Sequence, residues 1–255
     1  MLPAKQYPVV EASETMPGVF LLWVDAPEAA PSAQPGQFFM VASGPDAFLR
    51  RPLSLHRLGR GARTGQIAFL FQVLGKGTTW LAQRRPGDSL DILGPLGHGF
   101  SLGPEGPVLA AAGGLGVAPL VALVEQARER GIEVTLLLGA LTARLLYPAR
   151  LVPPGVALVQ TTDDGSAGIK GRVTDVLPRL LDGHRQVFAC GPEAMYRSMR
   201  SLAGRYPSLD AAQVSTEARM GCGTGLCLGC SLPTRDGMKR VCHEGPVFRL
   251  GELVL

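Results

Sequence analysis

The chain has 255 residues, of which 46% are hydrophobic and 18% charged, so it is long enough and apolar enough to bury a substantial core. Its net charge of +4 is mild, and the basic residues are scattered rather than gathered in a stripe among aromatics, which argues against nucleic-acid binding. Glycines and a proline interrupt the longest apolar run, residues 108–124, so no run suits a membrane-spanning helix. We expect no nucleic-acid partner and no membrane anchor.

The first part of the chain, residues 1–102, alternates short β-like runs with turn residues. Many short strands at such spacing are typical of a small antiparallel barrel. The sequence therefore predicts a barrel as the first domain. The clearest runs lie at residues 19–24, 35–41 and 66–74.

Two motifs within these residues carry groups that bind phosphate. In the run 49–55, Arg51 beside Pro52 can hold a phosphate through two parallel bonds, and the Ser54 hydroxyl faces the same way along a strand. Residues 75–79, Gly-Lys-Gly-Thr-Thr, form a glycine turn that opens a helix and would aim backbone N–H groups at an anion. Taken alone, the first motif favours a basic surface strand, and the second is equally a plain turn with an N-cap.

From residue 103 to about 212 the rhythm changes to apolar strand, glycine loop and helix. This order predicts a parallel sheet covered by helices, with ligands at the carboxyl ends of the strands. Pro119 stands where the third glycine of G-x-G-x-x-G would be expected, so the sheet is related to, but distinct from, that of a Rossmann dehydrogenase. The expected strands are residues 107–112, 134–139, 156–160 and 186–191, and the expected helix is residues 120–130.

Two further loops follow strands of this sheet. In residues 161–166, Asp163 and its neighbours can hydrogen-bond ribose hydroxyls, although the segment is equally a good turn. Cys190 ends a strand just before Gly191 and Pro192, which open a helix. A lone cysteine is most often a buried structural residue, but this position also fits a catalytic residue that lies against a nicotinamide ring.

Four of the five cysteines fall within residues 221–242, with the spacing C-x4-C-x2-C-x11-C and interleaved glycines. The first three have the spacing of plant-type [2Fe-2S] ferredoxins. Structural zinc usually shows two C-x2-C pairs, and disulfides need an oxidising compartment, whereas residues 1–5 do not resemble a secretory leader. We therefore predict a [2Fe-2S] cluster in a cytoplasmic protein. The proposed ligands are Cys222, Cys227, Cys230 and Cys242.

These motifs, in this order, resemble the ferredoxin-NADP reductase superfamily, and within it the electron-transfer subunits of class 1B dihydroorotate dehydrogenase. The resemblance covers essentially the whole chain. Its most specific elements are residues 162–166 followed by Gly171, and residues 217–222 followed by the other cysteines and residues 242–248.

The resemblance implies a β plus α/β fold with three parts. These are an N-terminal antiparallel FAD-binding β-barrel (1–102), a parallel-sheet NAD-binding α/β domain (103–212) and a small C-terminal [2Fe-2S] subdomain (213–255). It also implies the residues of each site. FAD would contact Arg51, Pro52, Leu53, Ser54, Leu70, Phe71, Gln72, Gly77 and Thr78; NAD would contact Gly113, Gly114, Gly116, Asp163, Gly191 and Pro192, with Cys190 as the catalytic residue.

Three such cofactors form a complete converter of electrons. A nicotinamide carries two electrons as a hydride and an iron-sulfur cluster carries one, and a flavin exchanges either number. The resemblance implies that an FMN-containing dihydroorotate dehydrogenase catalytic subunit supplies the electrons, in a heterotetramer of two copies of each chain, and that they pass through the cluster and FAD to NAD⁺ in pyrimidine biosynthesis. The alternatives are a diaphorase-type subunit of a hydrogenase, an NAD(P)H-dependent ferredoxin or sulfur reductase, and a zinc-stapled binding module.

Overall fold

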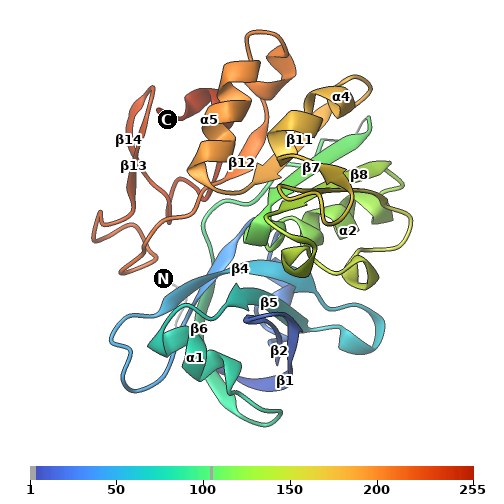
Figure 1. Ribbon diagram of the computed structural model, residues 1–255. Coiled ribbons are helices and arrows are strands. Elements are labelled where there is room, and N and C mark those ends of the chain that lie inside the picture. The colour runs from blue at the N-terminus through green and yellow to red at the C-terminus, as the bar shows by residue number, and fades with distance from the viewer. Residues whose placement is uncertain (1–3, 104–105) are drawn as a thin grey trace.

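The computed structural model describes residues 4–103 and 106–255, and its first part is a closed barrel at the bottom of Figure 1. The strands follow the order β1-β2-β5-β4-β3-β6, and each neighbouring pair is antiparallel. The predicted antiparallel barrel is confirmed. Its strands are β1 (Lys5–Met16), β2 (Val19–Asp25), β3 (Phe38–Val41), β4 (Arg51–Leu58), β5 (Gln66–Gln72) and β6 (Ser89–Leu96), and α1 (Lys76–Ala82) connects β5 to β6.

A seven-stranded sheet lies above the barrel, in the order β10-β9-β8-β7-β11-β12-β15 (Figure 1). Its pairs are parallel except for β12 and β15, which are antiparallel. The predicted parallel sheet is confirmed. The strands are β7 (Val108–Gly113), β8 (Val134–Ala140), β9 (Ala157–Thr162), β10 (Ile169–Lys170), β11 (Gln186–Cys190), β12 (Gln213–Ser215) and β15 (Val247–Arg249).

Helices cover this sheet, and for that reason its central strands are apolar throughout. Strand β7 reads Val-Leu-Ala-Ala-Ala-Gly and is buried up to its last residue. The glycine loop after it leads into α2, which places Val121, Leu123 and Val124 in the core, as the sequence predicts. The helices are α2 (Val121–Glu129), α3 (Val173–Val176), α4 (Pro178–Leu181) and α5 (Glu193–Leu202).

Short 3-10 turns complete the connections. The one after β7, η3, contains most of the glycine loop and lies between the barrel and the sheet. The turns are η1 (Ala30–Ser32), η2 (Gly61–Arg63), η3 (Gly114–Val117), η4 (Ala143–Leu145), η5 (Ala149–Leu151), η6 (Pro207–Leu209) and η7 (Leu250–Glu252).

The three predicted parts share apolar cores. One core joins the barrel residue Leu70 to Val117 and Phe188 of the sheet region. A second joins Met40 of the barrel to Phe248 near the C-terminus. The C-terminal residues also form the hairpin β13 (Ser231–Thr234) and β14 (Gly237–Arg240), and return to the large sheet through β15. The boundaries proposed after residues 102 and 212 stay a prediction, since β12 and β15 extend the sheet beyond the second of them.

Within the described ranges 4–103 and 106–255, the helices are all too short or too polar to cross a membrane.

Candidate cofactor sites

A cavity of about 280 Å³ lies where the barrel, the glycine loop and the C-terminal segment meet. The barrel contributes β4 and β5, and the loop contributes Leu115, Ala118 and Pro119. Glu217 and Met220 close it from the side of the cysteines. Eight of the nine residues predicted for FAD line this cavity, namely Arg51, Pro52, Leu53, Ser54, Leu70, Phe71, Gln72 and Thr78.

The ninth, Gly77, forms part of an anion cradle at one end of this cavity. A Cβ on Gly77 would lie 2.7 Å from the Ser43 Oγ and 3.2 Å from the Arg51 Nε, so only a glycine lets the backbone come this close. The Ser43 hydroxyl is buried and has no hydrogen-bond partner among the described residues. An orphaned hydroxyl beside a guanidinium and a bare backbone suits a phosphate, so these residues fit the pyrophosphate of FAD.

Arg50 and Arg51 have different roles although they are adjacent. Arg50 pairs with Asp91, with 2.8 Å between Nη1 and Oδ1, and so fastens β4 to β6. Arg51 donates to the Leu49 carbonyl and pairs with no carboxylate in the described part of the chain, which leaves its charge for a ligand. The Thr78 hydroxyl accepts N–H bonds from Leu74 and Gly75, so its first task is to shape the turn.

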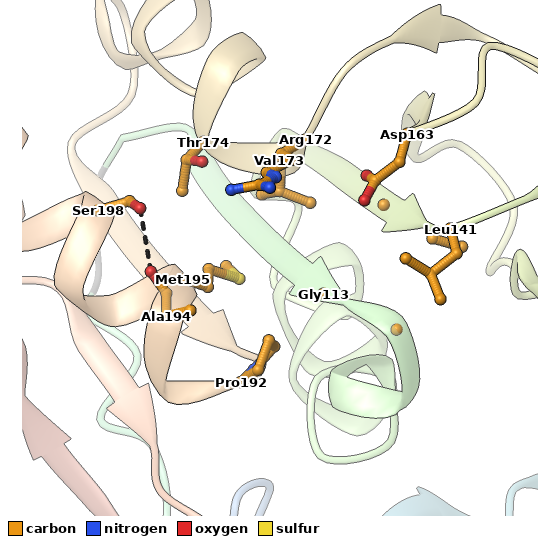
Figure 2. A pocket seen from close by; sticks show the side chains of 13 residues that line it. Gly113, Leu141, Asp163, Arg172, Val173, Thr174, Pro192, Ala194, Met195 and Ser198 are labelled. Carbon is orange, nitrogen blue, oxygen red and sulfur yellow. Dashed lines mark hydrogen bonds between the residues drawn. The ribbon is translucent and has the colours of Figure 1, made fainter.

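A second cavity, of about 470 Å³, opens at the carboxyl ends of β7, β8 and β9 (Figure 2). Of the residues predicted for NAD, Gly113, Gly114, Asp163 and Pro192 line it. Figure 2 shows Asp163 and Arg172 on the side away from Pro192. Several lining residues were not predicted from the sequence. Arg172 would have been the easiest of them to predict, because it directly follows Gly171 in the motif noted above. The others are Gly139, Ala140, Leu141, Val173, Thr174, Ala194, Met195 and Ser198.

Gly116 and Gly191 are not in the lining of this cavity, and their role is to let its walls approach. A Cβ on Gly116 would lie 2.0 Å from the Cys190 carbonyl oxygen, and a Cβ on Gly191 would lie 2.6 Å from the Met195 Sδ. The loop after β7 and the end of β11 therefore touch through bare backbone. Both glycines shape the cavity from behind.

Replacing Gly116 with alanine is expected to destabilise the protein by about 1–3 kcal/mol and to weaken NAD⁺ binding, because the added methyl group must push the loop after β7 away from the end of β11. Thermal unfolding and a nucleotide titration would measure the two effects. Gly204→Ala is the control, since a Cβ there has no atom within 4 Å and the backbone has no positive φ. Equal NAD⁺ affinity in both variants would contradict the role given to Gly116.

Cys190 is buried between the two cavities and lines neither, so its catalytic role stays a prediction. Burial, reinforced by the charge of Glu217, raises the pKa of Cys190 to about 12, so the thiol is neutral. Nearby, Tyr196 donates its hydroxyl to the Ser215 carbonyl at 2.6 Å and accepts the Gly191 N–H at 3.1 Å. Cys190 is thus a buried neutral thiol that is not suited to acting as a nucleophile.

Glu217 is a second group that our sequence analysis did not assign. It lines the cavity that contains the residues predicted for FAD, which we call the flavin cavity. Burial raises the pKa of its carboxyl group. Its place in the run 217–222, which the family resemblance singled out, was the only signal that pointed to it.

The four C-terminal cysteines form two pairs. The Cys222 Sγ accepts N–H bonds from Thr224 at 3.4 Å and Cys227 at 3.5 Å. In the other pair, the Cys230 Sγ accepts the Cys242 N–H at 3.4 Å, and the Cys242 Sγ accepts the Gly225 N–H at 3.1 Å. Donors around sulfur are what a negatively charged cluster with thiolate ligands needs.

The pairing favours a two-iron cluster over a single ion. A structural zinc needs four ligands in one tetrahedron, whereas each iron of a [2Fe-2S] cluster takes two protein sulfurs. Cys230 and Cys242 are buried, while Cys227 is exposed, so one iron would lie nearer the surface than the other.

The two pairs differ in the electrostatics of their thiols. Burial and the hydrogen bond with Cys230 raise the pKa of Cys242 to about 12. Burial would raise the pKa of Cys222 too, but the N–H bonds from Thr224 and Cys227 outweigh it and lower that pKa to about 6. Because thiolates ligate iron, cluster assembly would release a proton from the buried pair.

Some of the glycines between the cysteines adopt backbone conformations that other residues rarely adopt. Gly223 and Gly225 have positive φ, at 73° and 83°, and a Cβ on Gly223 would lie 2.5 Å from the Met40 Cγ of the barrel. Gly221 and Gly229 do not have positive φ; instead Leu228 does, at 58°. The loop therefore sits directly on the barrel, and Met220, two residues before the first ligand, reaches the flavin cavity.

Comparison with known proteins agrees with this arrangement. The family model "iron-sulfur cluster binding domain of dihydroorotate dehydrogenase B" matches residues 217–254. The chain is 41% identical over 249 residues, 93% of each chain, to the dihydroorotate dehydrogenase B (NAD(+)) electron transfer subunit of Desulforamulus reducens. It is 44% identical over 231 residues, 87% of each, to that of Bacillus caldolyticus. The chain belongs to the family of dihydroorotate dehydrogenase B electron transfer subunits.

A solved structure supports the fold over the full length. An NADH-dependent reduced ferredoxin-NADP oxidoreductase involved in flavin-based electron bifurcation superposes with a TM-score of 0.84 and 29% identity, covering 100% of this chain and 91% of that one. A ferredoxin reductase of carbazole 1,9a-dioxygenase, at 22% identity and a TM-score of 0.66, covers 80% of this chain and 66% of its own. The predicted resemblance to this superfamily is confirmed, and with it FAD, a [2Fe-2S] cluster and NAD as the cofactors of this dihydroorotate dehydrogenase B subunit.

Proposed function

We propose that this chain takes electrons from a catalytic partner that oxidises dihydroorotate and delivers them as a hydride to NAD⁺, in pyrimidine biosynthesis. One observation carries the proposal: the three sites share walls. Residues 113–119 border both cavities, since Gly113 and Gly114 line one and Leu115, Ala118 and Pro119 line the other. Met220 lines the flavin cavity and precedes the first cluster ligand by two residues.

The residues of this chain bind and orient the three groups. Bound FAD supplies the exchange between single electrons and a hydride. Arg51, Gly77 and Ser43 anchor its phosphates, while Leu70 and Phe71 form an apolar wall that excludes water from the reacting ring. A dry site protects a hydride from being lost to solvent.

On the nucleotide side, bare backbone at Gly113 and Gly114 lets a nucleotide lie close to the end of β7. Asp163 accepts hydrogen bonds from a ribose, and Pro192 borders the end nearest the flavin cavity. Cys190 lies behind this end as a small neutral group. The four cysteines Cys222, Cys227, Cys230 and Cys242 ligate the cluster.

We further propose that the partner subunit contains FMN, that two copies of each chain form a heterotetramer, and that the complex works in the cytoplasm. The name "electron transfer subunit" of the relatives supports a separate catalytic chain.

The direct test is to purify the tagged chain anaerobically from its own host with its bound partner, and to add dihydroorotate and NAD⁺. We expect NADH to form and the activity to need a co-purifying FMN protein. If the eluate passes electrons from NADH to a dye but does not respond to dihydroorotate, the dihydroorotate assignment fails. The second candidate would then apply, a reductase or hydrogenase subunit, which the likeness to the ferredoxin-NADP oxidoreductase favours.

Asp163→Asn is expected to lower the NAD⁺ affinity by about tenfold, because a charge-assisted hydrogen bond to a ribose hydroxyl is worth about 1.5–3 kcal/mol and the amide keeps part of it. Titration of the purified protein with NAD⁺ measures this. The neighbouring Asp164→Asn is the control: its carboxylate accepts the Ser166 N–H at 2.9 Å and holds the turn. An equal loss in both variants would mean that Asp163 serves the loop and not the ligand.

A further inference from the structure

A buried polar network connects β4, called the flavin strand here because it carries Arg51 and Ser54, to the nucleotide domain. The network lies on the side away from the cysteines. Its centre is His56 on β4, two residues beyond Ser54, with 0% of its surface exposed. The His56 Nδ1 lies 2.9 Å from the Ala118 carbonyl oxygen, and the Nε2 lies 3.1 Å from the Tyr147 hydroxyl. Both partners belong to the nucleotide domain, whereas His56 belongs to the barrel.

The protonation of this ring follows from its partners. A carbonyl oxygen can only accept, so the Nδ1 carries the proton and the Nε2 accepts the Tyr147 hydroxyl. Burial, together with the charge of Arg57, lowers the pKa of His56 to about 3, so the ring stays neutral at physiological pH. The network is therefore fixed in one hydrogen-bonded state across the working range of pH.

Arg57 adds three more hydrogen bonds from β4 to the nucleotide domain. Its guanidinium lies 2.6 Å from the Glu125 Oε1 on α2 and 3.3 Å from the Tyr147 hydroxyl, and it also donates to the Leu151 carbonyl. These groups are mostly buried, with side-chain exposures of 19% for Arg57 and 12% for Glu125. In the described residues, three segments of the nucleotide domain are thus tied to one short piece of β4.

Two consecutive residues of a strand normally face opposite sides, but here both reach Tyr147. The reason is a bulge in β4: Leu55 pairs with Phe69 and Arg57 with Ala68, so His56 is the extra residue. A bulge re-aims side chains and is usually found where a protein needs such a change. The backbone of β4 is therefore shaped so that both side chains reach the nucleotide domain.

What this network holds is the loop that separates the two cavities. Ala118, whose carbonyl binds His56, lines the flavin cavity, and Gly113 and Gly114 of the same loop line the nucleotide cavity. The apolar core that joins Leu70 to Val117 already holds the two domains together. Buried polar bonds add little net stability to such a core, but they define one geometry for it.

We propose that His56, Arg57 and Tyr147 are positioning residues that set the height of loop 113–119 over the flavin strand, and thereby the approach of the nicotinamide to the flavin. This inference rests on the proposed function, because it concerns hydride transfer between the two cavities. A hydride moves two electrons and one proton across a single contact, so the rate depends on the separation of the reacting atoms, and a displacement of about 1 Å can cost on the order of 100-fold.

The test compares Tyr147→Phe and His56→Asn with the wild-type protein loaded with FAD. Tyr147→Phe removes one hydroxyl and keeps the ring, which packs edge-on against His56 with centroids 5.7 Å apart. His56→Asn retains a donor near the Nδ1 position and loses the bond to Tyr147. The measurements are the rate of flavin reduction by NADH, in which NADH is oxidised to NAD⁺, the NAD⁺ dissociation constant, and the hydrogen exchange of amides 114–118 without nucleotide.

We expect both variants to reduce the rate of flavin reduction by on the order of tenfold. Their FAD content and NAD⁺ dissociation constants should stay within about twofold of the wild type, because no cavity-lining side chain is changed. Amides 114–118 should exchange faster, since the loop loses its tether. The control Tyr7→Phe removes a buried tyrosine hydroxyl of the barrel that lines neither cavity, and should leave all three quantities unchanged.

Wild-type rates in both variants, with only a lower melting temperature, would overturn the proposal and leave the network a packing feature. A fall in FAD content or a matching rise in the NAD⁺ dissociation constant would overturn it too, because binding and not positioning would then be affected. If the wild-type flavin is not reduced by NADH at all, the proposed function itself fails, and this result is distinct from the other two.

Discussion

Replacing Cys242 with alanine is expected to remove the iron-sulfur cluster and to abolish the transfer of electrons from the partner to NAD⁺. Cys242 is buried beside Cys230, and its Sγ accepts the Gly225 N–H at 3.1 Å, so an alanine leaves the buried pair with a single sulfur. Mutation of a residue that only hydrogen-bonds to a metal ligand costs about 10–100-fold in metal affinity or activity. Loss of a ligand itself should cost more. Iron and acid-labile sulfide content and a low-temperature EPR signal of the reduced protein measure the cluster directly.

The same variant should keep a reaction that does not need the cluster. The two cavities that we propose for FAD and NAD⁺ have none of these four cysteines in their walls, so transfer from NADH to a dye should remain near the wild-type rate. The fifth cysteine supplies the control. Cys190→Ser lies in the nucleotide domain and should leave iron and sulfide at wild-type levels. Retention of the cluster in Cys242→Ala, or its loss in Cys190→Ser, would show that the ligand set has been assigned wrongly.

The cysteine site was predictable because its information is local. Four cysteines at fixed spacing, with glycines between them, predict thiolate ligands of an iron-sulfur cluster without any information from the rest of the chain. Arg51 and Ser54 lie on one strand, and Gly113 and Asp163 lie at strand ends where parallel sheets bind ligands, so their places in the cavity walls could be predicted in the same way. Their contacts with FAD and NAD stay predictions.

Groups that act together from distant segments were not predictable. Ser43 matters only because Gly77 brings its bare backbone close to both Ser43 and Arg51. His56 matters only because a bulge turns it toward Ala118. The residues next to Ser43 and His56 in the sequence do not indicate which distant residues these two side chains contact. The contact between Gly116 and Cys190 likewise depends on how two strands pair in the sheet whose paired residues are 78 positions apart, such as Gln186 and Val108.

The barrel strand β1 was missed for a different reason. Residues 5–16 carry Pro8 and several charged and small residues, so their alternation is weak and their strand propensity low. The strand forms because β2 pairs with one of its edges and β6 with the other. Closure of the barrel supplies backbone hydrogen bonds that override local preference, which no window of sequence reveals.

Arg51→Ala is expected to weaken FAD binding by on the order of 100-fold, because two charge-assisted hydrogen bonds to a phosphate are worth about 3 kcal/mol together. The ratio of flavin to protein absorbance after gel filtration, and a titration of the apoprotein with FAD, measure the loss. Arg50→Ala is the matched control: it breaks the ion pair with Asp91, so it should cost about 1 kcal/mol of stability or less and leave the FAD affinity unchanged. The opposite ranking would reverse the roles given to the two arginines.

Ser43 in the anion cradle leads to a second prediction, which does not depend on Arg51. It concerns the direction in which the melting temperature changes with and without FAD. The Ser43 hydroxyl is buried without a partner in the described chain, and an unsatisfied buried hydroxyl destabilises a protein by about 1–3 kcal/mol. Without FAD, Ser43→Ala should therefore melt at the same temperature as the wild type or higher. With saturating FAD the order should reverse, because the wild type then gains a hydrogen bond to phosphate that the variant lacks. A variant that is less stable in both states would show that Ser43 serves the barrel and not the flavin.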